Sequence, residues 1–101
     1  GGCSIQTDDG VKVADVAWAS DEFMRRNGET TPYEEAPEIC IEIVSPSNSR
    51  EEMDEKIKLY LAKGALEVWI CADDGTVKHF SRDGRMTRST LTNESVKLTY
   101  T

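Results

Sequence analysis

Two acidic residues and one lysine have the types and the spacing of a metal-dependent phosphodiesterase site. Asp15 lies in the alternating segment 11–19, and Glu42 lies in the strongly apolar segment 38–44. Carboxylate oxygens are the ligands that Mg²⁺ and Mn²⁺ prefer. Such a cation neutralises charge on a phosphoryl oxygen and lowers the pKa of water. Lys56, which follows in the chain, could orient that water or stabilise developing negative charge.

Each of these residues also has an ordinary structural explanation. A single acid in an apolar strand is more simply a strand-end residue in contact with water, or one paired with a nearby arginine or lysine. Lys56 alone is more simply a side chain whose stem covers apolar surface while its ammonium group reaches water. Two acids, Asp15 and Glu42, favour a shared site, because an unpaired buried carboxylate is costly. His79, the one histidine of the chain, is interpreted as a surface strand residue.

Residues 38–44, with the sequence EICIEIV, form the strongest predicted strand. Successive side chains of a strand alternate between faces, so Glu42 shares a face with Cys40 and Val44. The other face carries Ile39, Ile41 and Ile43. A strand that is apolar on both faces is typical of the middle of a covered sheet. Glu42 is therefore predicted to be a carboxylate with apolar neighbours inside the protein.

A hairpin is predicted to carry Asp15. Its strands are residues 2–6 and 11–19, and the Asp-Gly pair between them is a strong turn signal. Because strand side chains alternate, Asp15 is predicted to lie between Val13 and Ala17 on one face of the second strand.

A helix is predicted to carry Lys56. Ser49 and Glu52 have the spacing of a capping box, so the helix is expected over residues 50–63, closed by Gly64. Lys56 lies at the edge of the apolar stripe of this helix and can reach back toward the sheet. The stripe consists of Met53, Ile57, Tyr60 and Leu61.

The remaining elements complete a mixed sheet. A second buried strand is predicted over residues 66–72, which makes the unit from residue 38 to residue 72 a parallel strand–helix–strand crossover. A short helix capped by Ser20, a loop over residues 29–37, and a meander with strands at 76–81, 86–90 and 96–100 are also predicted. The expected fold class is α/β (α+β), with an antiparallel meander at the C-terminal end.

Length, charge and cysteine content limit the possible functions. The chain has 101 residues and a formal net charge of −7, which suits a single domain over residues 1–101. The negative charge counts against a surface that binds DNA phosphates, unless basic residues gather on one face. The separated cysteines Cys3, Cys40 and Cys71 argue against a disulfide framework or zinc site. A cytoplasmic location is expected, and no apolar run approaches the roughly 20 residues of a membrane helix.

Four stretches together resemble the Uma-two family of endonucleases, which belongs to the PD-(D/E)XK, or restriction-endonuclease-like, superfamily. They cover most of the chain, and their combination is more specific than any one of them. The stretches are VADVAWAS at residues 13–20, APEICIEIVSPSNS at 36–49, DEKIKLYLAKGALEVWICADD at 54–74 and TVKHFSRDG at 76–84.

The resemblance implies a role for each candidate residue. It makes Asp15 the aspartate of the motif and Glu42 its second acid. Many relatives of the superfamily have a lysine where this chain has Val44, and the resemblance implies that Lys56 on the following helix takes its place. The backbone carbonyl of Ile43 would be a further ligand of Mg²⁺ or Mn²⁺.

The resemblance also implies two supporting residues, and the chain differs from the family pattern in two ways. Ser45 and Tyr60 would support the site. Ala14 stands where the motif has a proline, which removes no ligand. The resemblance also leads us to expect that this sequence begins after an N-terminal region that family members usually carry. We expect such a chain to expose a sheet edge or apolar patch and to form homo-oligomers.

Three functional hypotheses follow. The first is a metal-dependent endonuclease that hydrolyses DNA phosphodiester bonds through Asp15, Glu42 and Lys56. The second is a truncated, catalytically inactive relative that acts as an oligomerising or binding module. The third is a structural domain in which the acids are solvated.

Overall fold

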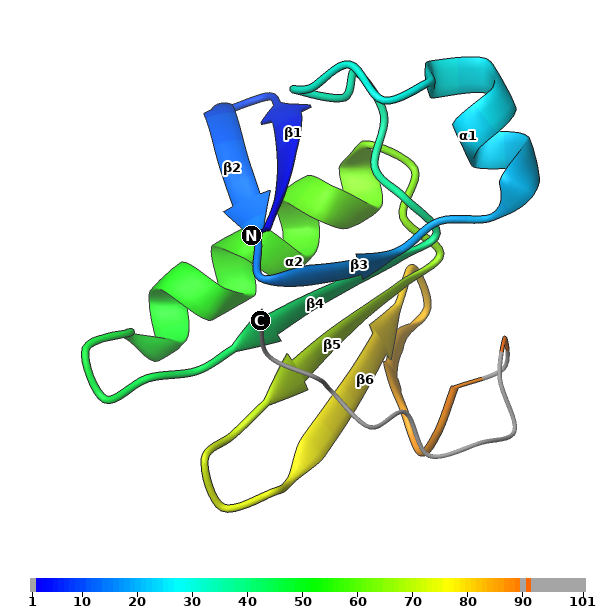
Figure 1. Ribbon diagram of the computed structural model, residues 1–101. Helices are drawn as coiled ribbons and strands as arrows, with labels where there is room; N and C mark the ends of the chain where they lie inside the picture. The colour runs from blue at the N-terminus through cyan, green and yellow to red at the C-terminus, as the bar shows by residue number, and fades with distance from the viewer. Residues whose placement is uncertain (1, 90, 92–101) are drawn as a thin grey trace.

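A five-stranded sheet with the order β3-β4-β5-β6-β7 forms the centre of the computed structural model (Figure 1), which describes residues 2–89 and 91. Strands β4 and β5 are parallel, and the other neighbouring pairs of this sheet are antiparallel. The predicted parallel crossover and the antiparallel pairing that follows it are confirmed. The strands are β3 (Val16–Trp18), β4 (Ile39–Ile43), β5 (Glu67–Cys71), β6 (Val77–Ser81) and β7 (Gly84–Met86).

Helix α2 (Arg50–Ala62) connects β4 to β5 and begins with the predicted capping box. Ser49 Oγ accepts a hydrogen bond from the Glu52 amide at 3.1 Å, and Glu52 Oε1 accepts one from the Ser49 amide at 3.4 Å. These two bonds satisfy backbone donors that the first turn of a helix leaves unpaired. The helix is followed by Gly64, whose φ of 104° is rare for residues with a side chain.

The strand predicted over residues 11–19 is wrong, because the chain bends at Asp15. Strand β2 (Gly10–Ala14) ends before this residue and pairs with β1 (Cys3–Thr7) in a separate two-stranded sheet. Strand β3 begins after it and pairs with β4. Asp15 therefore lies at the junction of the two sheets and not on a strand face between Val13 and Ala17.

A side-chain hydrogen bond accounts for this break. Val16 is opposite Ile41 in the ladder of β3 and β4, so an uninterrupted ladder would place Ala14 opposite Ile43. Instead, the amide of Ile43 donates to Oδ2 of Asp15 at 2.7 Å. The carboxylate thus takes the place of a backbone acceptor, and the chain before Asp15 is free to leave the sheet.

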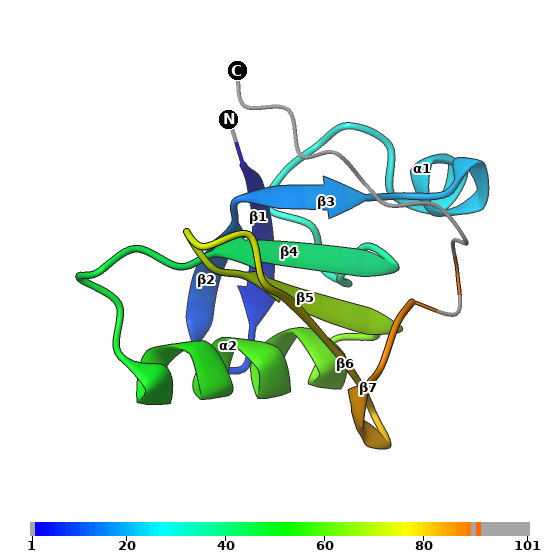
Figure 2. The same cartoon turned by 90° about the horizontal axis from the view of Figure 1, so that it is seen from below.

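The two faces of the main sheet bury different side chains. Helix α2 and the β1-β2 hairpin cover the face that carries Cys40 and Val68, where Ile5 and Tyr60 are also buried. Figure 2 shows α2 running along this side of the strands. The opposite face has a second cluster, formed by Ile39, Ile41, Trp69 and Cys71. This arrangement confirms the predicted alternation of residues in β4.

The other predicted elements are confirmed in part. Helix α1 (Asp21–Asn27) is capped by Ser20, as predicted. The strand predicted over residues 86–90 was placed too far along the chain, because Gly84 itself pairs with Ser81 and β7 ends at Met86. The strand predicted over residues 96–100 lies outside the described residues. Among the described helices, none is long and apolar enough to cross a membrane.

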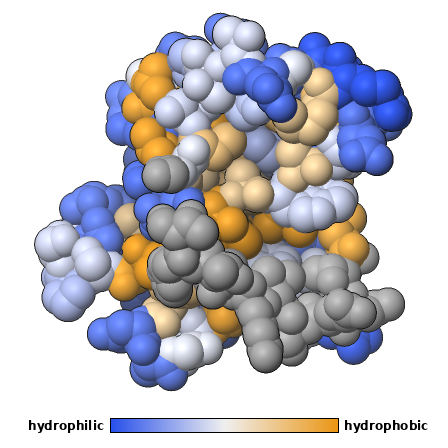
Figure 3. Space-filling model, in the orientation of Figure 1, coloured by the Kyte–Doolittle hydropathy of each residue, from blue (hydrophilic) through white to orange (hydrophobic). Residues whose placement is uncertain are grey.

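Strand β2 presents apolar side chains to solvent. Val11 is 50% exposed and Val13 is 45% exposed, and Figure 3 shows the resulting apolar surface over this strand. Exposed apolar residues on a two-stranded sheet agree with the expectation of an apolar patch. Homo-oligomer formation itself stays a prediction.

The Ser49→Ala variant should lose about 1 kcal/mol of unfolding free energy, because the first turn of α2 then lacks its cap. Urea unfolding followed by tryptophan fluorescence measures this loss. Thr30→Ala, in an exposed loop, is the control and should unfold with the wild-type midpoint. Equal midpoints for Ser49→Ala and wild type would contradict a stabilising capping box.

Candidate functional site

Glu42, on the face of β4 that α2 covers, is the central residue of the candidate site. Its side chain is almost completely buried, with 2% of the residue exposed. Oε2 accepts a hydrogen bond from the Tyr60 hydroxyl at 2.6 Å and lies 3.2 Å from Nζ of Lys56. Lys56 and Tyr60 are four residues apart on α2 and therefore lie on the same side of the helix. One helical turn thus supplies both partners of the buried carboxylate.

Asp15 approaches the same end of β4 from the bend between β2 and β3. Its Oδ2 binds the amide of Ile43 at 2.7 Å, one residue after Glu42. The negative charge of Asp15 is close enough to raise the pKa values of Glu42 and Tyr60, although burial is the largest cause of both shifts. The fold therefore brings together the two acids and the lysine that the sequence singled out.

Burial determines the acid–base properties of the site. Burial raises the pKa of Glu42, and its contacts with Tyr60 and Lys56 oppose that rise without cancelling it. Burial also raises the pKa of Tyr60, and the hydrogen bond to Glu42 adds to this effect. Tyr60 therefore keeps its proton and acts as a donor to the carboxylate.

Two alternatives from the sequence can now be weighed. Lys56 is not merely a surface cation, because it forms an ion pair with a buried carboxylate. This ion pair is also what a purely structural buried glutamate would form. The approach of Asp15 is what distinguishes the site, since a second negative charge beside Glu42 makes its ionised form harder to bury. Such an arrangement is stabilised by a cation.

Within the described part of the chain, Ser45 forms no hydrogen bond with the acids, Lys56 or Tyr60. Its hydroxyl lies 2.8 Å from that of Ser47 and donates to Oδ1 of Asn48 at 3.0 Å, and the residue is exposed. These bonds shape the loop between β4 and α2. A supporting role for Ser45 would therefore act through the position of this loop.

His79 is not the surface residue that the sequence suggested. It is partly buried, and its ring packs edge-on against Trp69, with centroids 4.8 Å apart. Trp69 belongs to the cluster on the sheet face opposite Glu42. His79 therefore packs on the sheet face opposite Glu42.

The oxygen atoms of the site fit a divalent cation. Both contacts of Glu42 are made by Oε2, and the contact of Asp15 is made by Oδ2. Among residues 2–89, Oε1 of Glu42 and Oδ1 of Asp15 make no hydrogen bond or ion pair, so each acid keeps one oxygen for a ligand. Mg²⁺ is commonly held by one or two carboxylates, with waters and substrate phosphate completing its shell.

Only two acids contribute to this arrangement. The structure, over the residues that it describes, contains no group of three or more His, Cys, Asp or Glu side chains able to hold a metal. A cation at Asp15 and Glu42 would therefore need neutral oxygens, such as the predicted backbone carbonyl of Ile43. Hard, oxygen-binding cations suit that set better than zinc.

Comparison with protein families matches nearly the whole chain. The model of a family described as "Putative restriction endonuclease" covers residues 1–99. The chain belongs to this family, Uma2. The resemblance seen in the sequence is therefore confirmed, and with it the affiliation to restriction-endonuclease-like proteins.

A solved structure supports the fold of this Uma2 protein. It is described as "a putative nuclease belonging to DUF820" from Anabaena variabilis, with a TM-score of 0.63 and 23% sequence identity. The match covers 79% of the present chain and 47% of the other, so this chain spans about half the length of that structure. A search of curated proteins gives no match.

The Glu42→Gln variant should become more stable than wild type as the pH rises. Because the pKa of Glu42 is raised in the folded state, its stabilising contribution is complete below the unfolded pKa near 4.5 and is lost as the pH rises through the folded pKa. Glutamine imitates the protonated form, so the two proteins should unfold alike near pH 4 and diverge at higher pH.

Urea unfolding of both proteins at several pH values between about 4 and 9 measures this divergence. Glu29→Gln removes one charge from an exposed turn and serves as the control, for which little divergence is expected. A pH-independent difference between Glu42→Gln and wild type would show that burial does not raise the pKa of Glu42.

Proposed function

We propose that this Uma2 protein is a divalent-metal-dependent endonuclease that hydrolyses phosphodiester bonds of DNA. The observation that carries the proposal is the convergence of Asp15, Glu42 and Lys56 at one end of β4. Asp15 binds the backbone amide of Ile43, the residue after Glu42, and Lys56 forms an ion pair with Glu42. Membership of a family described as "Putative restriction endonuclease" supports the same chemistry and the choice of DNA. Fold and family alone would not be sufficient, because related folds can lose their activity.

In this proposal Asp15 and Glu42 hold Mg²⁺ or Mn²⁺, assisted by the backbone carbonyl of Ile43. When bound, the cation would neutralise charge on a phosphoryl oxygen and make a water molecule a better nucleophile. The bend at Asp15 and the burial of Glu42 prepare both carboxylates before any ligand arrives. Preorganised groups of this kind need little rearrangement during the reaction.

Lys56 supplies a positive charge 3.2 Å from Oε2 of Glu42. Its ammonium group is held by Oε2 of Glu42, and its side chain is 26% exposed, so it lies at the boundary between protein and solvent. From there it can donate a hydrogen bond to the attacking water or to an oxygen of the phosphate. Stabilisation of the developing negative charge is the larger expected contribution.

Tyr60 is proposed as a positioning residue. Its hydrogen bond to Oε2 lowers the pKa of Glu42, against the effect of burial. The hydroxyl thus favours the ionised carboxylate and fixes the orientation of its free oxygen. Ser45 would contribute indirectly, by ordering the loop that precedes α2.

The location and the assembly of the protein are also proposals. A cytoplasmic location would give the enzyme access to cellular DNA. Homo-oligomers, expected from the exposed apolar residues of β2, would place two sites in one particle.

Lys56→Met should reduce Mg²⁺-dependent nicking of supercoiled plasmid by about 10²–10³-fold, because a preorganised charge near the phosphate is lost. The matched control is Lys58→Met, which removes an exposed lysine two residues away on the same helix and should nick at nearly the wild-type rate. Gel electrophoresis of plasmid over time measures the rates.

Calorimetric titration with Mn²⁺ separates metal binding from cleavage. Asp15→Ala and Glu42→Ala should lose the binding heat, whereas Lys58→Met should retain it. Equal heats for wild type and both alanine variants would overturn the metal site. Equal nicking by wild type and Lys56→Met would overturn the assigned role of the lysine.

Tyr60→Phe should move the acidic limb of the pH–rate profile to higher pH, because the pKa of Glu42 rises when its hydrogen bond is removed. It should also lose about 1.5–3 kcal/mol of unfolding free energy, the usual value for a hydrogen bond to a charged group. Nicking rates and urea unfolding across the pH range measure both effects. A loss of stability without a shift of the pH–rate profile would show that Tyr60 contributes only to the packing of the fold.

A further inference from the structure

A second feature of the molecule is a cavity of about 470 Å³ between the first half of α2 and strands β5, β6 and β7. Three of its lining residues are cationic, namely Arg50 from α2, Lys78 from β6 and Arg85 from β7. One lining residue, Asp54, is acidic. We refer to this cavity as the cationic pocket.

The charge of the cationic pocket is opposite to that of the whole chain. The protein has 19 acidic and 12 basic residues, yet three cations and one acid meet here. Among the described residues, Arg50, Lys78 and Arg85 form no salt bridge. The pKa of Asp74 is lowered mainly by its hydrogen bond with Thr76. Attraction to Lys78 contributes to the same shift.

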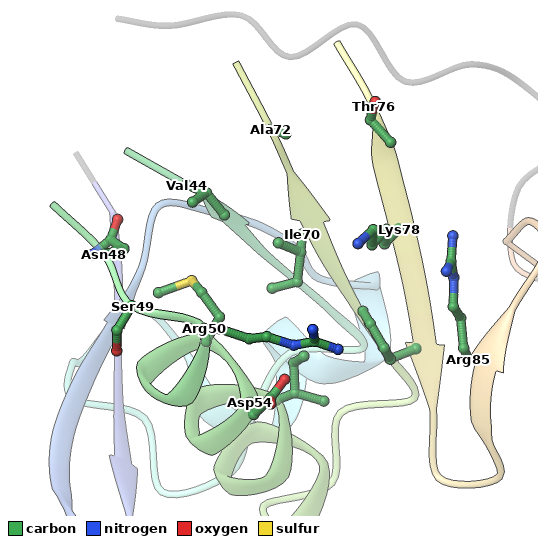
Figure 4. A pocket seen from close by; sticks show the side chains of 13 residues that line it. Val44, Asn48, Ser49, Arg50, Asp54, Ile70, Ala72, Thr76, Lys78 and Arg85 are labelled. Atoms are coloured by element: carbon green, nitrogen blue, oxygen red, sulfur yellow. The ribbon is translucent and has the colours of Figure 1, made fainter. Parts of the chain in front are cut away.

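The three cations come from separate elements and project around a common space. Figure 4 shows Arg50 reaching from α2 toward the sheet, Lys78 turned toward Ile70, and Arg85 alongside them on β7. Ile57, Ile70 and Phe80 also line the cavity. A pocket that combines unpaired cations with an apolar and aromatic lining suits a ligand with both phosphates and flat apolar groups, as a nucleic-acid strand has.

The cationic pocket lies beside the candidate active site. Val44, which lines the pocket, follows Ile43, whose amide binds Asp15. Met53, also in the lining, precedes Lys56 by about one turn of α2. The pocket and the site therefore adjoin the same end of β4 and the same stretch of helix.

We propose that the cationic pocket binds the phosphate backbone of the same DNA strand whose phosphodiester bond lies at Asp15, Glu42 and Lys56. This inference rests on the proposed function and assigns to it a substrate-binding surface. It also removes the conflict between DNA binding and a net charge of −7, because phosphate contacts depend on local cations. Arg50, Lys78 and Arg85 would hold the strand without selecting its sequence.

The test is the binding of a fluorescein-labelled DNA oligonucleotide, followed by anisotropy without divalent metal at several salt concentrations. The double variant Lys78→Gln/Arg85→Gln should bind at least about tenfold more weakly and reduce the salt slope by about 1–2, because each phosphate contact contributes roughly one unit to that slope. The matched control, Arg25→Gln/Lys58→Gln, removes the same charge from exposed positions outside the pocket. It should change binding by less than about twofold, since remote charges are screened.

Two outcomes would overturn the inference. One is equal binding by the pocket variant and the control variant. The other is binding of a mononucleotide or inorganic phosphate as tight as that of the oligonucleotide, which would assign the pocket to a small anion. Urea unfolding of both double variants verifies that the comparison concerns folded proteins.

The same experiment distinguishes the pocket from the proposed hydrolysis. Lys58→Met, which lies outside both the pocket and the proposed site, should bind the oligonucleotide and nick plasmid at nearly the wild-type level. Pocket-dependent binding by a chain that never nicks DNA would support the pocket and overturn only the proposed hydrolysis. Efficient nicking by the pocket variant, with wild-type affinity for DNA, would overturn the pocket and support the proposed hydrolysis.

Discussion

The burial of the Glu42 carboxylate is the constraint on which the rest of the site depends. A carboxylate in an apolar interior is unfavourable unless hydrogen bonds and opposite charge compensate for its lost hydration. Tyr60 and Lys56 provide that compensation from one helical turn, so the position of α2 against the sheet and the state of Glu42 are coupled. The raised pKa of Glu42 shows that compensation is incomplete. A bound cation would complete it, which connects the stability of the fold to the proposed chemistry.

The bend at Asp15 connects the two sheets with the site. The hydrogen bond between Asp15 and the Ile43 amide ends the ladder of β3 and β4. It also allows the preceding strand to turn away and pack, as part of the β1-β2 hairpin, against α2. One carboxylate thus has a structural role through Oδ2 and leaves Oδ1 for a ligand. In the proposed site, such dual use would let a small protein position an acid with few contacts.

Charge is distributed unevenly over the structure. The acidic excess of the chain would repel a polyanion at long range, whereas the cationic pocket offers local attraction beside the candidate site. Helix α2 and the later strands β6 and β7 supply its cations. The local charge of this surface therefore differs in sign from the net charge of the chain.

The pattern of residues was sufficient to predict the main elements, because their signals are local. Alternating residues in β4, the capping box of Ser49 and Glu52, and the glycine after α2 act within a few residues of one another. Residue types and spacing, and then the family resemblance, singled out Asp15, Glu42 and Lys56 as candidates. Local patterns could not reveal the bend at Asp15, since an alternating segment looks the same whether it joins one sheet or two. The bend depends on a hydrogen bond to Ile43, 28 residues away in the chain.

Only the tertiary structure decided which charges meet. It paired Lys56 with Glu42, bonded Ser45 to Ser47 and Asn48, packed His79 against Trp69, and gathered Arg50, Lys78 and Arg85 around one cavity. The sequence by itself determined the types of these residues and the elements that carry them. Their distances depend on how α2 and the strands pack, because contacts between separate elements leave no periodic signal in the chain.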